Sequence, residues 1–142
     1  MPEGFTETQF CHEGVTKTVY RRGEGPLVVV MPEIPGVTPL VAAFAKRVAD
    51  EGFTVALPDL FGIPDKQPSA AYVGSQLIRS CISKEFKLLA GHEASPMTKW
   101  VRALCRDLRK ELGDVKVGAI GMCITGNFAL ALMIDDWLMA PV

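Results

Sequence analysis

A lone cysteine, Cys123, stands in the stretch GAIGMCITGNFAL, where one apolar run ends and a second begins. Gly121 lies two residues before it and Gly126 three residues after it. A nucleophile held at the tip of a sharp strand-to-helix turn needs small flanking residues, because the strand and the helix approach each other closely there. The pattern therefore favours a nucleophilic thiol over the alternative, a buried structural cysteine, which is a common role of free cysteine.

Such a turn would also activate the thiol. The N–H groups and the dipole at the start of a helix favour the thiolate, which is the reactive form of cysteine. The backbone N–H of Ile124 would point at the oxygen of a bound ester carbonyl, as one donor of an oxyanion hole. The other cysteines, Cys11, Cys81 and Cys105, lack this context, and Cys105 fits the apolar stripe of a helix. We interpret these three as ordinary thiols.

A second stretch, MPEIPGVTP at 31–39, directly follows the first buried strand expected in the chain. Its place, before the first helix, is that of the loop that supplies a second oxyanion donor in enzymes with such a turn. Glu33 would stand at the carboxyl end of the strand, facing the crevice in which open α/β sheets bind ligands; the alternative is a solvated loop acid. Asp59, in LPDLFG, is interpreted as a turn residue that bonds its own backbone.

The elements that must position these residues alternate between strand and helix. In the stretch 5–21, residue character alternates roughly along two halves rich in Thr, Val and aromatic residues, with Glu13-Gly14 between them. This pattern predicts an antiparallel hairpin. Continuous apolar runs predict buried strands, and these runs lie at 26–33, 53–62, 115–121 and 137–142. Three helices are predicted, from Thr38-Pro39 to Gly52, from Ser95-Pro96 to Gly113, and over 126–134. This order predicts an α/β fold with a mostly parallel sheet and helices on both faces, preceded by the hairpin.

Length and composition indicate one globular domain. The 142 residues are 49% hydrophobic and 22% charged, with a net charge of −1, so no face for nucleic acid is expected. No stretch approaches the roughly 18 apolar residues that span a membrane, and the first ten residues do not form a signal peptide. We therefore expect a cytoplasmic protein that binds neither nucleic acid nor membrane. Because 137–142 would be an apolar edge strand, we expect residues 1–142 to be the incomplete, N-terminal part of a larger domain, truncated soon after the helix that follows the turn.

Together, these stretches resemble the dienelactone hydrolase family. MPEIPGVTP, VALPDLFG and VGAIGMCITGNFALAL follow one another in the order and spacing of that family, over about residues 24–142. The family comprises α/β-hydrolases with a cysteine nucleophile in a Gly-x-Cys-x-Gly-Gly elbow. The resemblance implies a hydrolase that cleaves carboxylic ester or lactone bonds of a small molecule through an acyl-enzyme, with no metal or organic cofactor.

The resemblance also implies roles for particular residues. Cys123 corresponds to the family nucleophile, and Ile124 to the elbow residue whose N–H is an oxyanion donor. Glu33 corresponds to the acid that helps to activate the thiol, and Ile34 to the residue with the second N–H donor. The family further uses a basic residue before the third helix to hold a substrate carboxylate. Arg79 and Lys84 lie in that region, and the alternative for both is a solvated helix face.

The chain departs from the family pattern in the elbow and after it. Thr125 replaces the elbow glycine, and its hydroxyl would narrow the pocket near the thiol without abolishing the elbow; Asn127 follows Gly126. The family base is a histidine held by an aspartate, both after the nucleophile. The 142 residues have only Asp135 and Asp136 there, and the two histidines, His12 and His92, precede the elbow. An Asp and a His beyond residue 142 would have to complete the site.

Two alternatives remain open from the sequence. A cysteine on a strand–helix elbow near an upstream glutamate also occurs in glutamine amidotransferases and DJ-1-like proteins, although Gly126-Asn127-Phe128 replaces their usual continuation. The missing Asp and His are also compatible with a catalytically inactive hydrolase relative that acts as a binding module.

Overall fold

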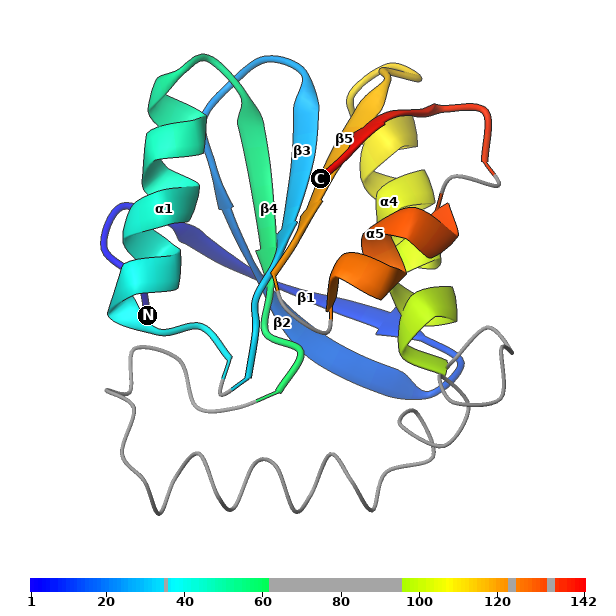
Figure 1. Ribbon diagram of the computed structural model, residues 1–142, viewed down its shortest axis with the longest axis horizontal. Coiled ribbons are helices and arrows are strands. Elements are labelled where there is room, and N and C mark those ends of the chain that lie inside the picture. Colours follow the sequence, from blue (N-terminus) through cyan, green and yellow to red (C-terminus); the bar gives the residue numbers. More distant parts are fainter. Residues whose placement is uncertain (35, 62–95, 123–124, 133–134) are drawn as a thin grey trace.

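The computed structural model describes residues 1–34, 36–61, 96–122, 125–132 and 135–142 (Figure 1). The described strands are β1 (Thr6–His12), β2 (Val15–Arg22), β3 (Leu27–Met31), β4 (Thr54–Pro58), β5 (Val117–Gly121) and β6 (Leu138–Pro141). They form one sheet in the order β1-β2-β4-β3-β5-β6. The described helices are α1 (Pro39–Asp50), α4 (Pro96–Glu111) and α5 (Gly126–Ala131). In this part of the chain, no helix has the length and apolar character needed to cross a membrane.

The first two strands form the predicted hairpin. β1 pairs antiparallel with β2, and both residues of the connecting turn, Glu13 and Gly14, have positive φ angles of 49° and 78°. Positive φ at both central residues is typical of the tight turns that match the twist of a hairpin. The hairpin joins the rest of the sheet through β2, which pairs antiparallel with β4. It also contacts α4, where the Trp100 ring packs edge-on against Phe10 and its indole N–H donates to the carbonyl of Val15.

The remaining strands confirm the predicted parallel sheet. β3 pairs with β4 on one side and with β5 on the other, and β5 pairs with β6, all in parallel. All five residues of β3 are buried, as the continuous apolar run predicts for a central strand covered on both faces. β4 and β5 are shorter than the predicted runs: β4 occupies the first half of the run 53–62, and β5 the last five residues of the run 115–121.

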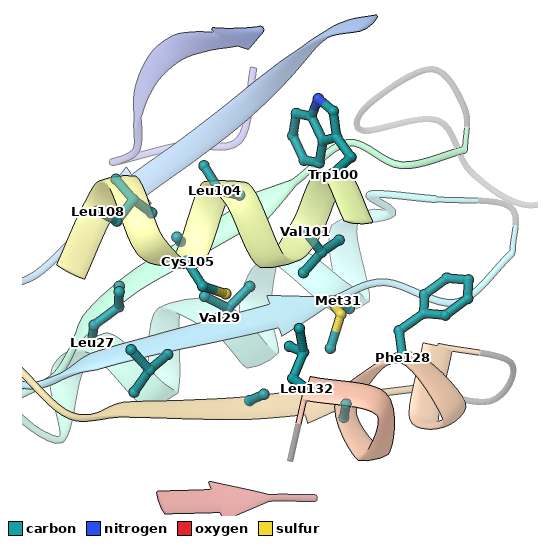
Figure 2. Packing of buried hydrophobic residues seen from close by; sticks show 14 of the residues in the cluster. Leu27, Val29, Met31, Trp100, Val101, Leu104, Cys105, Leu108, Phe128 and Leu132 are labelled. Carbon is teal, nitrogen blue, oxygen red and sulfur yellow. The ribbon is translucent and has the colours of Figure 1, made fainter. Parts of the chain in front are cut away.

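Helices cover both faces of this sheet, as the strand–helix order predicts (Figure 1). α1 packs on the face to which β3 presents Val28 and Val30. Its N-cap is Thr38, whose hydroxyl accepts a hydrogen bond from Val41 N–H, and its C-cap is Glu51, one residue before the predicted Gly52. α4 and α5 pack on the opposite face, against Leu27, Val29 and Met31, because successive side chains of a strand point to opposite faces (Figure 2).

The apolar stripe predicted for the helix that begins at Pro96 is the buried face of α4. Its main members are Trp100, Val101, Leu104, Cys105 and Leu108 (Figure 2). Burial, together with the nearby negative charge of Asp135, raises the pKa of the Cys105 thiol to about 12. Cys105 is therefore a core residue with an unreactive thiol at neutral pH, as its place on the stripe predicts.

Asp135 connects α4 to the segment that leads into β6. One carboxylate oxygen lies 2.7 Å from Nε of Arg102, and the other lies 2.8 Å from a guanidinium nitrogen of Arg106. Arg102 also donates to the carbonyl of Ala131, at the end of α5. The Asp135 side chain is only 11% exposed, so the removal of one partner of this ion pair would leave the other charge largely shielded from water and unpaired.

We expect Asp135→Asn to lower the free energy of unfolding by about 2 kcal/mol, because the mostly buried Arg102 loses its counter-charge. Urea unfolding followed by circular dichroism measures this change. The matched control is Asp50→Asn, which removes an exposed carboxylate that also bonds two basic side chains, Arg22 and Lys46. Equal shifts in the urea midpoint for the two variants would contradict the prediction.

Candidate active site

The candidate site lies where β3 and β5 end side by side. The last residue pair of their ladder is Met31 with Gly121, so both strands end at the same level of the same sheet edge. One residue further, Met122 N–H donates to the Met31 carbonyl at 3.3 Å. The segments that follow the two strands therefore leave the sheet from neighbouring points. In the sequence these segments carry Glu33 after one strand and Cys123 after the other, each two residues beyond the last pair.

Gly121 is required by the close approach of the turn to the strand. A Cβ added here would lie 2.5 Å from the carbonyl carbon of Thr125 and 2.6 Å from the nitrogen of Gly126, and closer still to the Thr125 carbonyl oxygen. Real Cβ atoms do not approach other atoms within 3.0 Å. At Gly126, by contrast, the nearest described atom would be 3.8 Å away, an ordinary contact. The small residue before the cysteine is thus a steric necessity, whereas a Cβ at Gly126 would not crowd any of the described residues.

Thr125 has a different role from the one expected. Its side chain is fully buried, and its hydroxyl oxygen lies 2.7 Å from Met122 N, 2.8 Å from the Met122 carbonyl and 3.0 Å from the Met31 carbonyl. The hydroxyl is therefore turned into the backbone between the two strand ends and does not narrow a pocket. The bond to Met122 could have been predicted from the sequence, because Ser and Thr hydroxyls bond backbone groups three or four residues earlier in the chain.

Glu33 and Ile34 lie in a tight turn between β3 and α1. The Glu33 carbonyl accepts a hydrogen bond from Gly36 N–H at 2.7 Å, and the Gly36 carbonyl accepts one from Thr38 N–H at 2.9 Å. The Glu33 side chain is exposed, and Ile34 is half-buried. No hydrogen bond joins the Ile34 N–H to another described residue. At the sheet edge where β5 also ends, the loop thus has an exposed carboxylate and a backbone N–H that is unpaired within the described part of the chain.

The other residues predicted for the site fall outside the described part of the chain or far from it. Cys123, Ile124, Arg79 and Lys84 lie outside the described residues, as do Cys81 and His92. His12 is described, at the end of β1. Three strands separate β1 from β5 in the sheet, so the fold does not bring this histidine next to the turn. Among the described residues, no group of three or more potential ligands could hold a metal ion.

A cavity of about 310 Å³ lies on the α1 side of the sheet, against β5 and β6. Its lining is apolar apart from Lys116 and includes Val28, Gly118 and Ile120. Neither Glu33 nor Ile34 contributes to it. A catalytic pocket needs polar groups that converge on the reacting atoms. We therefore assign no catalytic role to this cavity and place the candidate site at the ends of β3 and β5.

We expect Gly121→Ala to destabilise the protein by roughly 2–3 kcal/mol, because the backbone atoms that meet the new methyl group cannot move out of its way as a flexible side chain could. Gly118→Ala is the matched control in the same strand, since the atom nearest to its Cβ would be a Val28 methyl carbon at 3.4 Å, an ordinary contact. Denaturant unfolding of both variants measures the difference. A Gly121→Ala protein as stable as the Gly118→Ala protein would show that the turn tolerates a side chain.

Comparisons with known proteins identify the family and the fold of the chain. Residues 14–140 match the dienelactone hydrolase family. No curated protein matches the chain. Among solved structures, a dienelactone hydrolase-like promiscuous phosphotriesterase from metagenomic libraries matches with a TM-score of 0.63 and 22% identity, over 90% of this chain and 52% of that one.

Two further solved structures share the fold. The α/β hydrolase GrgF from Penicillium sp. sh18 matches with a TM-score of 0.63 and 15% identity, over 94% of this chain and 43% of that one. A haloalkane dehalogenase from Agrobacterium tumefaciens matches with a TM-score of 0.58 and 16% identity, over 90% of this chain and 36% of that one. Residues 1–142 thus have the α/β-hydrolase fold and span between a third and about half of the length of these proteins.

Proposed function

The chain belongs to the dienelactone hydrolase family, and we propose that it hydrolyses carboxylic ester or lactone bonds of small molecules with Cys123 as the nucleophile. The observation that carries the proposal is the pairing of β3 with β5 up to Met31 and Gly121. This register brings the segment that contains Glu33 and Ile34 to the edge at which the strand before Cys123 ends. Nucleophile, acid and oxyanion donors must meet at one point for acyl transfer, and this sheet edge is where they can do so.

In the proposed reaction, the Cys123 sulfur attacks the carbonyl carbon, and the carbonyl oxygen becomes an oxyanion. The backbone N–H groups of Ile124 and Ile34 donate hydrogen bonds to that oxygen. The tetrahedral intermediate then expels the alcohol oxygen, which takes up a proton, and an acyl-enzyme thioester remains. Attack by water on the thioester carbon releases the carboxylic acid and restores the thiol.

Glu33 is proposed to activate the thiol. Its carboxylate is exposed in the loop after β3, so it is free to accept a proton or to face a bound ester. Arg79 and Lys84 are proposed to hold a substrate carboxylate through a charge-assisted hydrogen bond. The general base for hydrolysis of the thioester is proposed to be a His oriented by an Asp, neither of which occurs at a matching position in residues 1–142.

The family match favours this hydrolase over the amidotransferase and DJ-1-like alternative. Because no histidine follows Cys123 in the 142 residues, acylation of the thiol is a sharper test than turnover. We expect residues 1–142 to release about one equivalent of p-nitrophenolate from p-nitrophenyl acetate and then to stop. Peptide mass spectrometry at acidic pH should find the acetyl group on Cys123.

Cys105 is an internal control in the same digest, because its buried thiol has a pKa of about 12 and should remain unmodified. Cys11 is exposed and reports the reactivity of an ordinary thiol. Cys123→Ser should abolish the burst. Acetylation of Cys11 as fast as that of Cys123 would refute the proposal, and sustained turnover by residues 1–142 would refute the assignment of the base.

We expect Glu33→Gln to lower the rate of Cys123 acylation by roughly 10²-fold, because the amide cannot take the thiol proton. Its stability should not change, since the carboxylate is exposed. The matched control is Glu24→Gln, an exposed acid before β3, at the opposite end of that strand. Stopped-flow release of p-nitrophenolate measures both rates. Equal rates for the two variants would show that Glu33 is a solvated loop acid.

A further inference from the structure

A single buried hydroxyl joins the two segments on which the proposed function depends. The Thr125 oxygen contacts backbone groups of Met31, at the end of β3, and of Met122, directly after β5. These contacts lie at the last ladder pair, Met31 with Gly121, and one residue beyond it, where the two strands end. The side chain is fully buried.

The hydrogen-bonding capacity of a hydroxyl matches this position. It has one proton to donate and two lone pairs that accept. The oxygen accepts from Met122 N–H at 2.7 Å and donates its proton to the Met31 carbonyl at 3.0 Å or to the Met122 carbonyl at 2.8 Å. Met122 N–H also reaches the Met31 carbonyl at 3.3 Å, so the three residues form one closed network. A buried network of this kind holds its members in one arrangement.

We propose that Thr125 is a positioning residue of the active site, which sets the distance between the loop after β3 and the turn after β5. The inference rests on the proposed function, in which these two segments each supply one oxyanion donor and also carry Glu33 and Cys123. An oxyanion hole works only with donors 2.7–3.1 Å from the oxygen, and a misplacement of about 1 Å can slow a reaction on the order of 10²-fold. Thr125 acts through the backbone of Met31 and Met122 and does not touch the substrate.

The test compares Thr125→Val, which keeps the shape but not the hydroxyl, with Thr125→Ser, which keeps the hydroxyl. Acetylation of Cys123 by p-nitrophenyl acetate is followed over a range of ester concentrations in residues 1–142. We expect the Val variant to lower the maximal acylation rate constant at least roughly ten-fold, with a half-saturating ester concentration within about two-fold of wild type. The Ser variant should restore the rate constant to within about three-fold of wild type.

Thr54→Val is the matched control. The Thr54 hydroxyl is also buried and donates to a backbone carbonyl, that of Gly25, at 2.8 Å, but it lies at the opposite end of the parallel strands. This variant should lower stability and leave the acylation rate constant unchanged. If it slows acylation as much as Thr125→Val does, the loss reflects general destabilisation, and the positioning role is refuted.

The remaining outcomes also decide the question. Wild-type rates in a folded Thr125→Val protein refute the positioning role and leave the proposed function intact. An unreactive wild-type chain refutes the proposed function and this inference with it. If the Val variant does not fold, Thr125→Ala and Thr125→Ser are compared, because they differ by one oxygen atom. Equal rates for that pair, or failure of the Ala variant alone to fold, would show a purely structural hydroxyl and overturn the inference.

Discussion

The structure depends on how closely the turn after β5 approaches the end of that strand. The added Cβ that Gly121 cannot accommodate would meet the backbone of Thr125 and Gly126, so the chain reverses within a few residues. Only this reversal brings Thr125 back to the strand end, where its hydroxyl reaches both Met122 and Met31. A side chain at residue 121 would push the turn away and open the network. The absence of a side chain at Gly121 is therefore required for the arrangement of both loops at the sheet edge.

The register of the sheet behind this edge is fixed by burial of its central strand. β3 is buried along its whole length, between α1 on one face and α4 with α5 on the other (Figures 1 and 2). Its alternate side chains pack into two separate apolar clusters, so a slip of one residue would place every side chain in the wrong cluster. The register that pairs Met31 with Gly121 is thus specified by the core. The loop that carries Glu33 starts directly after Met31, so this register fixes where the loop begins, and the Glu33 side chain is exposed.

The cysteines show why residue type alone does not decide reactivity. Cys105 lies in the core beside the Asp135 carboxylate, and its thiol stays protonated because its pKa is about 12. Cys11 is exposed on the first strand of the hairpin. Periodicity along α4 is enough to predict the burial of Cys105, since Trp100, Leu104 and Leu108 share its face. For Cys123, the sequence context and the family predict a nucleophile, and its side chain lies outside the described residues.

Local patterns in the sequence determine the elements and their order. The Glu13-Gly14 turn, the Thr38-Pro39 helix start and the apolar run of β3 each form as predicted, because turn conformation, capping and burial depend on neighbouring residues. Family membership likewise follows from motifs along the chain. Only the tertiary structure decides what Thr125 does. In the sequence it is a departure from a glycine pattern, and its bond to Met31 spans 94 residues. A hydrogen bond between groups so distant in sequence cannot be predicted from local patterns, because it forms only after the register of β3 and β5 has brought the two groups together.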